Sequence, residues 1–201
     1  VYRRTFRLLA KPREFVYRGT VYSSIAAHPC ATKLPKNPHQ HWTFSPVASE
    51  NAFFAATLKA FDTSLAKLQM DYVDLYLVHW PIKGLRKDTW LALEKLYADR
   101  RVRAIGVANY LVPFLQELES YANIIPVLDQ VEFTPWLFNR ALLDYCGQRD
   151  IRLQSYSPIT RGKKFGDPRL IQLCEKYGKT PAQVILRWNI EHGVSTIPKS
   201  S

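Results

Sequence analysis

The stretch Val73-Asp74-Leu75-Tyr76-Leu77-Val78-His79-Trp80-Pro81 decides the fold class of this chain. Its first six residues are almost all apolar, with β-branched and aromatic members, which predicts a strand buried on both faces. Strands of that kind belong to parallel sheets that helices cover. Pro81 ends the strand, because proline has no N–H to donate to a strand ladder.

His79 therefore comes at the carboxyl end of a buried parallel strand. In α/β barrels and open α/β sheets, this end of the strands carries the chemistry. A histidine there can exchange a proton near neutral pH or donate a hydrogen bond to a carbonyl group. The strand alone is equally compatible with a core histidine whose ring is hydrogen-bonded to the backbone. Other parts of the sequence are needed to distinguish the two interpretations.

Length and composition indicate one globular domain. The 201 residues are 47% hydrophobic and 22% charged, so we expect a single domain over residues 1–201. No apolar run reaches the ~18 residues of a membrane span, and the basic N-terminus lacks the apolar core of a signal peptide. The odd number of cysteines (Cys30, Cys146, Cys174) and their spacing indicate reduced thiols in a cytoplasmic protein.

The histidines and the net charge of +11 point to no metal or macromolecular partner. His28, His39 and His41 have no carboxylate or cysteine at ligand spacing, so we expect loop histidines and no metal site. The basic residues are spread along the chain without a nucleic-acid motif, so we expect neither nucleic acid nor membrane as a partner. One cluster, residues 161–164, has a further interpretation given below.

From residue 51 onward, helical and strand patterns alternate. We expect helices at 54–68, 90–97, 113–121 and 140–148, and strands at 73–79, 104–110, 127–133 and 151–156. Two more helices have matching ends: a capping residue before proline opens each (Asp167-Pro168, Thr180-Pro181), and glycine follows each (Gly178, Gly193). A short strand at 194–198 comes last, and another is expected around 30–34.

This order predicts parallel strands joined by right-handed crossovers. The carboxyl ends of such strands meet at one rim of the sheet. Each expected strand ends in a polar residue, and together these are Lys33, His79, Asn109, Gln130, Tyr156 and Lys199. Their convergence favours the functional interpretation of His79.

These residues and their surroundings resemble the aldo-keto reductase family. The similarity extends from about residue 51 to the end, and its motifs are Met70 to Pro81, Val102 to Tyr110, Asp129 to Pro135, Ser155 to Pro158, Gly178 to Trp188 and Ile197 to Ser200. It is greatest to microbial and protozoan members that include diketogulonate reductases and prostaglandin F synthases. The resemblance implies a (β/α)8 TIM barrel, a monomer, and NADPH-dependent reduction of a small-molecule aldehyde or ketone.

The resemblance also implies catalytic roles. His79 would orient the substrate carbonyl, and Trp80 would line the substrate pocket. Lys33, within Ala31-Thr32-Lys33-Leu34-Pro35, would lower the pKa of the tyrosine that donates the proton. A nearby cation makes a phenol a better acid near neutral pH, which such a reaction requires. The alternative for Lys33 is an ordinary lysine at a strand end.

Cofactor contacts follow from the same resemblance. Asn109 and Gln130 would hold the nicotinamide carboxamide, since a side-chain amide offers both a donor and an acceptor. Tyr156 would stack on the ring, although a core aromatic is the alternative. Ser157 and the basic cluster would lie along the pyrophosphate.

Lys199 and Ser200 would hold the 2′-phosphate and give NADP preference over NAD. No GxGxxG fingerprint supports a Rossmann domain instead.

Three departures from the family pattern matter. Ala108 replaces the usual serine, which removes one carboxamide contact. The family continues beyond Ser201. Residues 1–30 lack the motif that carries the family's catalytic aspartate and tyrosine, and only Tyr17 and Tyr22 lie in that region. We expect residues of the natural chain to be missing before Lys33 and after Ser201, because closing the barrel needs two further strands; a rebuilt N-terminal third is the alternative.

Two functions therefore remain open. The first is an active NADPH-dependent reductase, which His79 and Lys33 favour. The second is a catalytically impaired nucleotide-binding protein on the same barrel, which the missing tyrosine motif favours.

Overall fold

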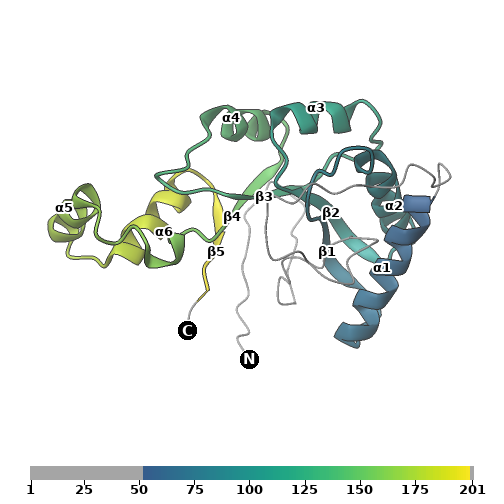
Figure 1. The fold of residues 1–201 in the computed structure, drawn as a ribbon, viewed down its shortest axis with the longest axis horizontal. Coiled ribbons are helices and arrows are strands. Elements are labelled where there is room, and N and C mark those ends of the chain that lie inside the picture. The colour runs from purple at the N-terminus through teal and green to yellow at the C-terminus, as the bar shows by residue number, and fades with distance from the viewer. Residues whose placement is uncertain (1–51, 200–201) are drawn as a thin grey trace. The chain divides into compact units, whose positions relative to one another are not determined.

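A computed structural model describes residues 52–199, where helices and strands alternate in the predicted order (Figure 1). The elements are α1 (Ala52–Leu68), β1 (Val73–Val78), α2 (Arg86–Ala98), β2 (Val102–Ala108), α3 (Val112–Glu119), β3 (Leu128–Glu132), α4 (Arg140–Gln148), β4 (Arg152–Tyr156), the 3₁₀ helix η1 (Thr160–Gly162), α5 (Pro168–Tyr177), α6 (Pro181–Glu191) and β5 (Ser195–Ile197). The expected strand at 30–34 lies outside the described residues, as do Lys33, Ser200, Tyr17 and Tyr22.

The chain divides into two compact units. The first unit holds the described residues up to Gly106 together with Tyr121–Ile124. The second unit holds Val107–Ser120 and the residues from Ile125 onward. Strand β2 contributes to both units.

The first unit is built on aromatic and aliphatic side chains between its helices and β1. The Phe61 and Tyr76 rings meet edge to face with centroids 5.0 Å apart, and Trp90 and Leu93 are fully buried. Full burial of one such side chain stabilises the fold by about 2–3 kcal/mol. β1 neighbours β2, and Val73 N donates to Arg101 O over 3.3 Å at the start of the pair.

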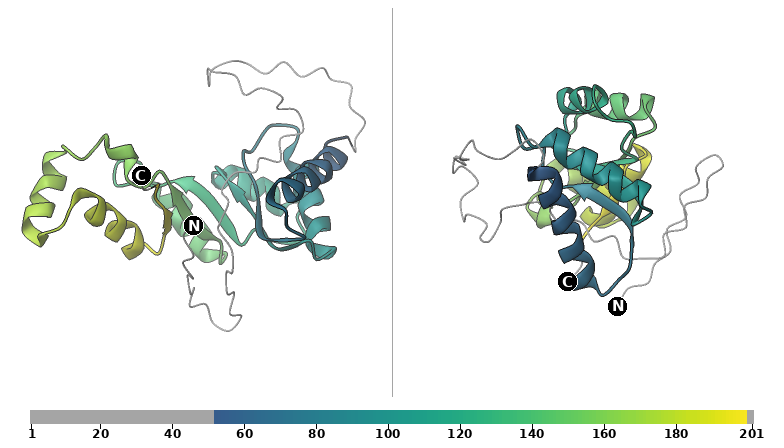
Figure 2. Two further views of the ribbon diagram at one scale, coloured as in Figure 1. Left: turned by 90° about the horizontal axis from the view of Figure 1, so that it is seen from below. Right: turned by 90° about the vertical axis from the view of Figure 1, so that its right-hand side faces the viewer.

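The second unit contains a parallel sheet. The end of β2 pairs with β3, β3 with β4 and β4 with β5, all in parallel. In register, Ala108 lies opposite Gln130, Gln130 opposite Gln154, and Gln154 opposite Ser195. Helices α3 and α4 lie side by side on one side of these strands (Figure 1 and Figure 2). The predicted α/β class with parallel strands is thus confirmed.

Local sequence signals place the last two helices correctly. Asp167 caps α5 by accepting from Arg169 N, Pro168 is the first helical residue, and Gly178 ends the helix with a φ of +59°. α6 begins with a capping box, in which Thr180 accepts from Gln183 N and the Gln183 side chain accepts from Thr180 N. These are the interactions that proline and capping residues at helix starts predict.

Several boundaries differ from the prediction by one or more residues, and Gln130 does not lie at a strand end. β2 covers Val102–Ala108 rather than 104–110, because Asn109 has a φ of +63° and a left-handed residue cannot continue a strand. Gln130 lies in the middle of β3 and not at its end. α2 begins at Arg86, four residues before the predicted start, and its N-cap Leu85 offers no capping side chain that would mark this boundary.

Two further findings concern residues 52–199. None of their helices is both long and apolar enough to span a membrane. Cys146 and Cys174 form no disulfide with each other or with any other residue of this range.

Candidate active site

Asn109 is the first residue after β2, and the chain turns out of the strand direction at this residue. Its N–H donates to Gln130 O over 2.9 Å, and its φ of +63° turns the chain toward α3. Asparagine adopts this left-handed conformation more readily than most residues. The turn therefore explains in local terms why asparagine stands at this strand end.

Tyr156, the last residue of β4, reaches Asn109 across the sheet. Its hydroxyl donates to Asn109 Oδ1 over 3.0 Å, although the two residues are 47 positions apart in the chain. Burial raises the pKa of the Tyr156 phenol above its usual value, and the charge of Glu132 acts in the same direction. The phenol therefore keeps its proton at neutral pH and remains a donor.

Gln130 is buried and paired with a residue that the sequence pattern did not single out. Its Nε2 donates to Oε1 of Gln154 over 2.8 Å, and the two glutamines lie opposite each other in β3 and β4. Gln154 comes two residues before Tyr156, so the two-residue period of a strand places them on the same face. The two-residue spacing from Tyr156 could therefore have identified Gln154 as a candidate residue of the site from the sequence.

The segment after Tyr156 has an unusual backbone. Ser157, Thr160 and Arg161 have φ values of +48°, +51° and +53°, and Gly162 follows with +77°. Left-handed conformations of non-glycine residues cost about 1–2 kcal/mol each, and such strain gathers at functional sites. The basic side chains Arg161, Lys163 and Lys164 of this segment are exposed.

Lys199 follows β5 by two residues and is exposed. The last residue of β5, Ile197, lies in register with Tyr156. Within the second unit, Asn109 thus follows the carboxyl end of β2, Tyr156 forms that of β4, and Lys199 lies two residues beyond that of β5.

In the first unit, His79 directly follows β1 and is half-buried. Its ring lies edge to face with Trp80, with centroids 5.9 Å apart, and Trp80 is 50% exposed. An exposed tryptophan beside a strand-end histidine offers an apolar surface next to a hydrogen-bonding group. The prediction that His79 shares one rim with Asn109, Gln130 and Tyr156 stays a prediction.

Metal-ligating side chains do not gather in the described part of the chain: no three histidine, cysteine or carboxylate residues come together there.

Comparison with known proteins places this chain. The sequence pattern of the aldo/keto reductase family matches residues 31–201, and the chain belongs to that family. The family assignment also confirms the predicted fold class, the (β/α)8 barrel, of which the chain covers part.

Among curated relatives, glyoxal reductase of Bacillus subtilis (strain 168) is 51% identical over 156 residues, which are 78% of this chain and 56% of the relative. The 9,11-endoperoxide prostaglandin H2 reductase of Trypanosoma cruzi is 42% identical over 163 residues, which are 80% of this chain and 58% of that protein. The chain thus spans a little over half the length of these relatives.

Solved structures agree with this assignment. An aldo/keto reductase from Brucella melitensis superposes with a TM-score of 0.70 at 46% identity, covering 73% of this chain and 57% of that one. A mutant of Gox0644 in complex with NADPH superposes with a TM-score of 0.69 at 37% identity, covering 72% and 54%.

Proposed function

We propose that this chain belongs to an NADPH-dependent oxidoreductase that reduces aldehyde and ketone carbonyls to alcohols by hydride transfer. The observation that supports it most is the bonded cluster in the sheet of the second unit, where Tyr156 at the end of β4 bonds to Asn109 after β2, and Gln130 bonds to Gln154 within β3 and β4. The family membership and a related structure that contains NADPH support it independently.

The strand-end residues fit a nicotinamide. A bound nicotinamide ring supplies the hydride for such a reduction. The Asn109 and Gln130 amides are held in fixed orientations by Tyr156 and Gln154, so each offers hydrogen-bonding groups of known direction to a carboxamide. The Tyr156 ring is half-buried at the same strand end and provides a flat apolar face for stacking.

Basic residues supply the phosphate contacts of this proposal. Ser157 opens the segment that carries Arg161, Lys163 and Lys164, which would follow the pyrophosphate. Lys199 and, outside the described residues, Ser200 would pair with the 2′-phosphate. A charged donor at that phosphate makes NADP the preferred cofactor over NAD.

The carbonyl chemistry is assigned to His79, Lys33 and a tyrosine. His79 would donate a hydrogen bond to the carbonyl oxygen and so orient it, and Trp80 would line the substrate pocket. Lys33 would stand beside the tyrosine and lower its pKa, so that the phenol can protonate the oxygen as the hydride arrives. We also propose a single barrel domain over residues 1–201, a monomer, and a cytoplasmic location.

The second candidate is a catalytically impaired nucleotide-binding protein on the same barrel. The observation that favours it is the sequence of residues 1–30, which lacks the catalytic tyrosine motif and precedes the family match. It shares the cofactor site of the first candidate but predicts no turnover.

A turnover assay separates the two candidates. NADPH absorbance is followed with small aldehydes and dicarbonyls, and NADPH binding is measured in parallel by fluorescence. The reductase predicts aldehyde-dependent loss of NADPH. Tight NADPH binding without turnover would support the impaired protein, and absence of NADPH binding would reject both.

A further inference from the structure

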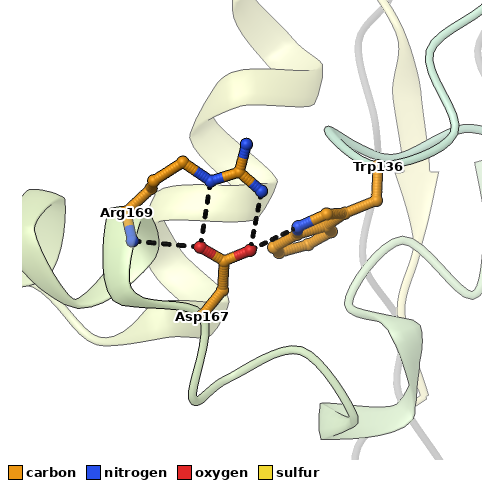
Figure 3. A network of polar contacts seen from close by, with 3 residues as sticks. All are labelled: Trp136, Asp167 and Arg169. Atoms are coloured by element: carbon orange, nitrogen blue, oxygen red, sulfur yellow. Dashed lines mark hydrogen bonds and ion pairs between the residues drawn. The ribbon is translucent and has the colours of Figure 1, made fainter.

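One side-chain contact ties the loop after β3 to the segment after β4. The Trp136 indole N–H donates to Asp167 Oδ2 over 2.8 Å (Figure 3). The same carboxylate caps α5 by accepting from Arg169 N at 3.0 Å, and the Arg169 guanidinium donates to both of its oxygens at 3.2 and 2.9 Å. Asp167 is thus the point where the segment meets both α5 and Trp136.

Trp136 is presented by a rigid turn. Thr134 and Leu137 bond to each other through their backbones, with Leu137 N donating to Thr134 O over 3.0 Å. Leu137 N also bonds to Thr134 Oγ1 at 3.0 Å, and Thr134 is almost fully buried. The indole donor therefore comes from a fixed position just beyond β3.

The segment that Asp167 ends runs from Ser157 to Asp167, and we name it the phosphate segment. Its backbone bonds are local turns, such as Thr160 N to Ser157 O at 2.9 Å and Asp167 N to Lys164 O at 3.1 Å. Such turns alone do not offset several left-handed residues, so contacts outside the segment have to hold its shape.

Two outside contacts flank the phosphate segment. Tyr156, directly before it, bonds to Asn109, and Asp167, at its end, bonds to Trp136. The donors around Asp167, first the Arg169 side chain and then Trp136, hold the pKa of this carboxyl well below its usual range. Asp167 therefore stays charged and remains a strong acceptor at every physiological pH.

We propose that Trp136 is a positioning residue that holds the phosphate segment in place along the cofactor and thereby slows the release of NADPH. This inference rests on the proposed function, since it assigns a further residue to the same site. Trp136 acts through Asp167 and takes no part in the hydride transfer.

Two variants break this contact in different ways. Trp136→Phe removes the indole N–H and keeps an aromatic ring. Asp167→Asn keeps an oxygen that can cap α5, since asparagine and aspartate are about equally good N-caps. Its NH₂ group, however, cannot accept from the indole when the oxygen serves the cap. Arg169→Gln is the matched control, because it removes an ion pair to the same carboxylate through a side chain that is 80% exposed.

The experiment measures the NADPH dissociation rate by stopped-flow fluorescence, together with the single-turnover rate of hydride transfer and the melting temperature. We expect release to be about three- to tenfold faster in Trp136→Phe and in Asp167→Asn, the effect of losing one ordinary hydrogen bond. The double variant should release NADPH no faster than the faster single variant, because both changes remove one interaction. The rate of hydride transfer in these variants should stay within about twofold of that of the unmodified protein. The NADPH dissociation rate of Arg169→Gln should also stay within about twofold.

Two results would overturn the proposal while leaving the proposed function intact. One is an unchanged dissociation rate in Trp136→Phe. The other is an equal acceleration in Arg169→Gln, which would assign the effect to a general weakening of the start of α5. An unmodified protein that does not bind NADPH would overturn the proposed function as well.

Discussion

The polar side chains at or near the carboxyl ends of the strands have different neighbours in the two units. In the second unit, polar groups from β2, β3 and β4 are bonded to one another, as in the Tyr156–Asn109 and Gln130–Gln154 pairs. In the first unit, His79 lies edge to face with a tryptophan that is half exposed. The second unit thus bonds polar side chains of different strands to one another, and the first unit places a histidine next to an apolar surface.

This difference suggests a division of labour. Preorganised groups lose little freedom when a ligand binds, so they increase affinity. A group that touches only the reacting oxygen increases the rate instead. Changes in the second unit should therefore alter cofactor binding, and changes at His79 should alter turnover.

The largest effect is expected for His79→Ala. We expect turnover with carbonyl substrates to fall by about 100-fold or more, with NADPH affinity nearly unchanged, because the proposed role of the histidine is a contact with the substrate oxygen alone. Steady-state kinetics and NADPH titration of the same preparation measure both quantities. Unchanged turnover would remove His79 from the mechanism. Weakened NADPH binding together with loss of the helical circular dichroism signal would support a core histidine instead.

The units also differ in how they bury a carboxyl group. In the first unit, Glu94 accepts from the Trp90 indole at 3.1 Å, from Asn123 N and Nδ2 at 2.7 and 3.0 Å, and from Ile124 N at 2.8 Å. In the second unit, the fully buried Asp129 accepts a long bond from Tyr110 N at 3.4 Å, and its Oδ2 has no hydrogen-bond partner among residues 52–199. Burial raises the pKa of Asp129 well above its usual value.

This contrast predicts opposite results from matched amide substitutions. Glu94→Gln should lower the free energy of unfolding by about 2–3 kcal/mol, because the amide NH₂ then faces the Asn123 Nδ2 donor and the other three donors lose a charged acceptor. Asp129→Asn should change it by less than about 1 kcal/mol at neutral pH, since it replaces a poorly satisfied buried carboxyl by a neutral group of the same shape. Urea unfolding of both variants measures this, and equal losses would contradict the contrast.

Lys199→Ala tests the proposed contact between Lys199 in the second unit and the 2′-phosphate of NADPH. The difference in binding free energy between NADPH and NADH should shrink by about 1–3 kcal/mol, the contribution of a charge-assisted hydrogen bond. Fluorescence titration with both nucleotides gives the difference directly. Lys179→Ala, at an exposed lysine between α5 and α6, is the control and should leave it unchanged. An unaltered difference in Lys199→Ala would show that other groups recognise the phosphate.

The smallest effect concerns alkaline pH. Burial, followed by the charge of Asp129, raises the pKa of the Cys146 thiol from 9.0 to about 12. The unfolded chain then loses this proton first, so the stability from the buried thiol is full below pH 9 and falls as pH rises toward 12. The free energy of unfolding is measured at about pH 8 and at about pH 10. Its decrease between these two pH values should be about 1 kcal/mol smaller in Cys146→Val than in the unmodified chain. Cys174→Val is the control, and the same reduction there would contradict the assignment.

The sequence predicted what local chemistry determines. Asp167-Pro168 and Thr180-Pro181 begin helices because capping groups and proline act within a few residues of themselves. His79 and Asn109 were expected at the ends of the strands 73–79 and 104–110, since a polar residue follows each apolar run, and in the structure each directly follows its strand.

Contacts between distant residues could not be predicted in this way. The Tyr156–Asn109 bond depends on the registers of β2, β3 and β4, which no single segment encodes. The Trp136–Asp167 bond joins loops that are 31 residues apart, so no local pattern marked either residue as a partner of the other. The start of α2 was missed because Leu85 provides no capping side chain.

The central claim is that the strand ends of the second unit bind NADPH, and a fluorescence titration of the unmodified protein with NADPH and with NADH tests it most directly. The bonded Asn109, Gln130 and Tyr156 cluster together with Lys199 predicts binding of both nucleotides, with NADPH bound more tightly. Equal affinity for the two nucleotides, or binding of neither, would contradict it.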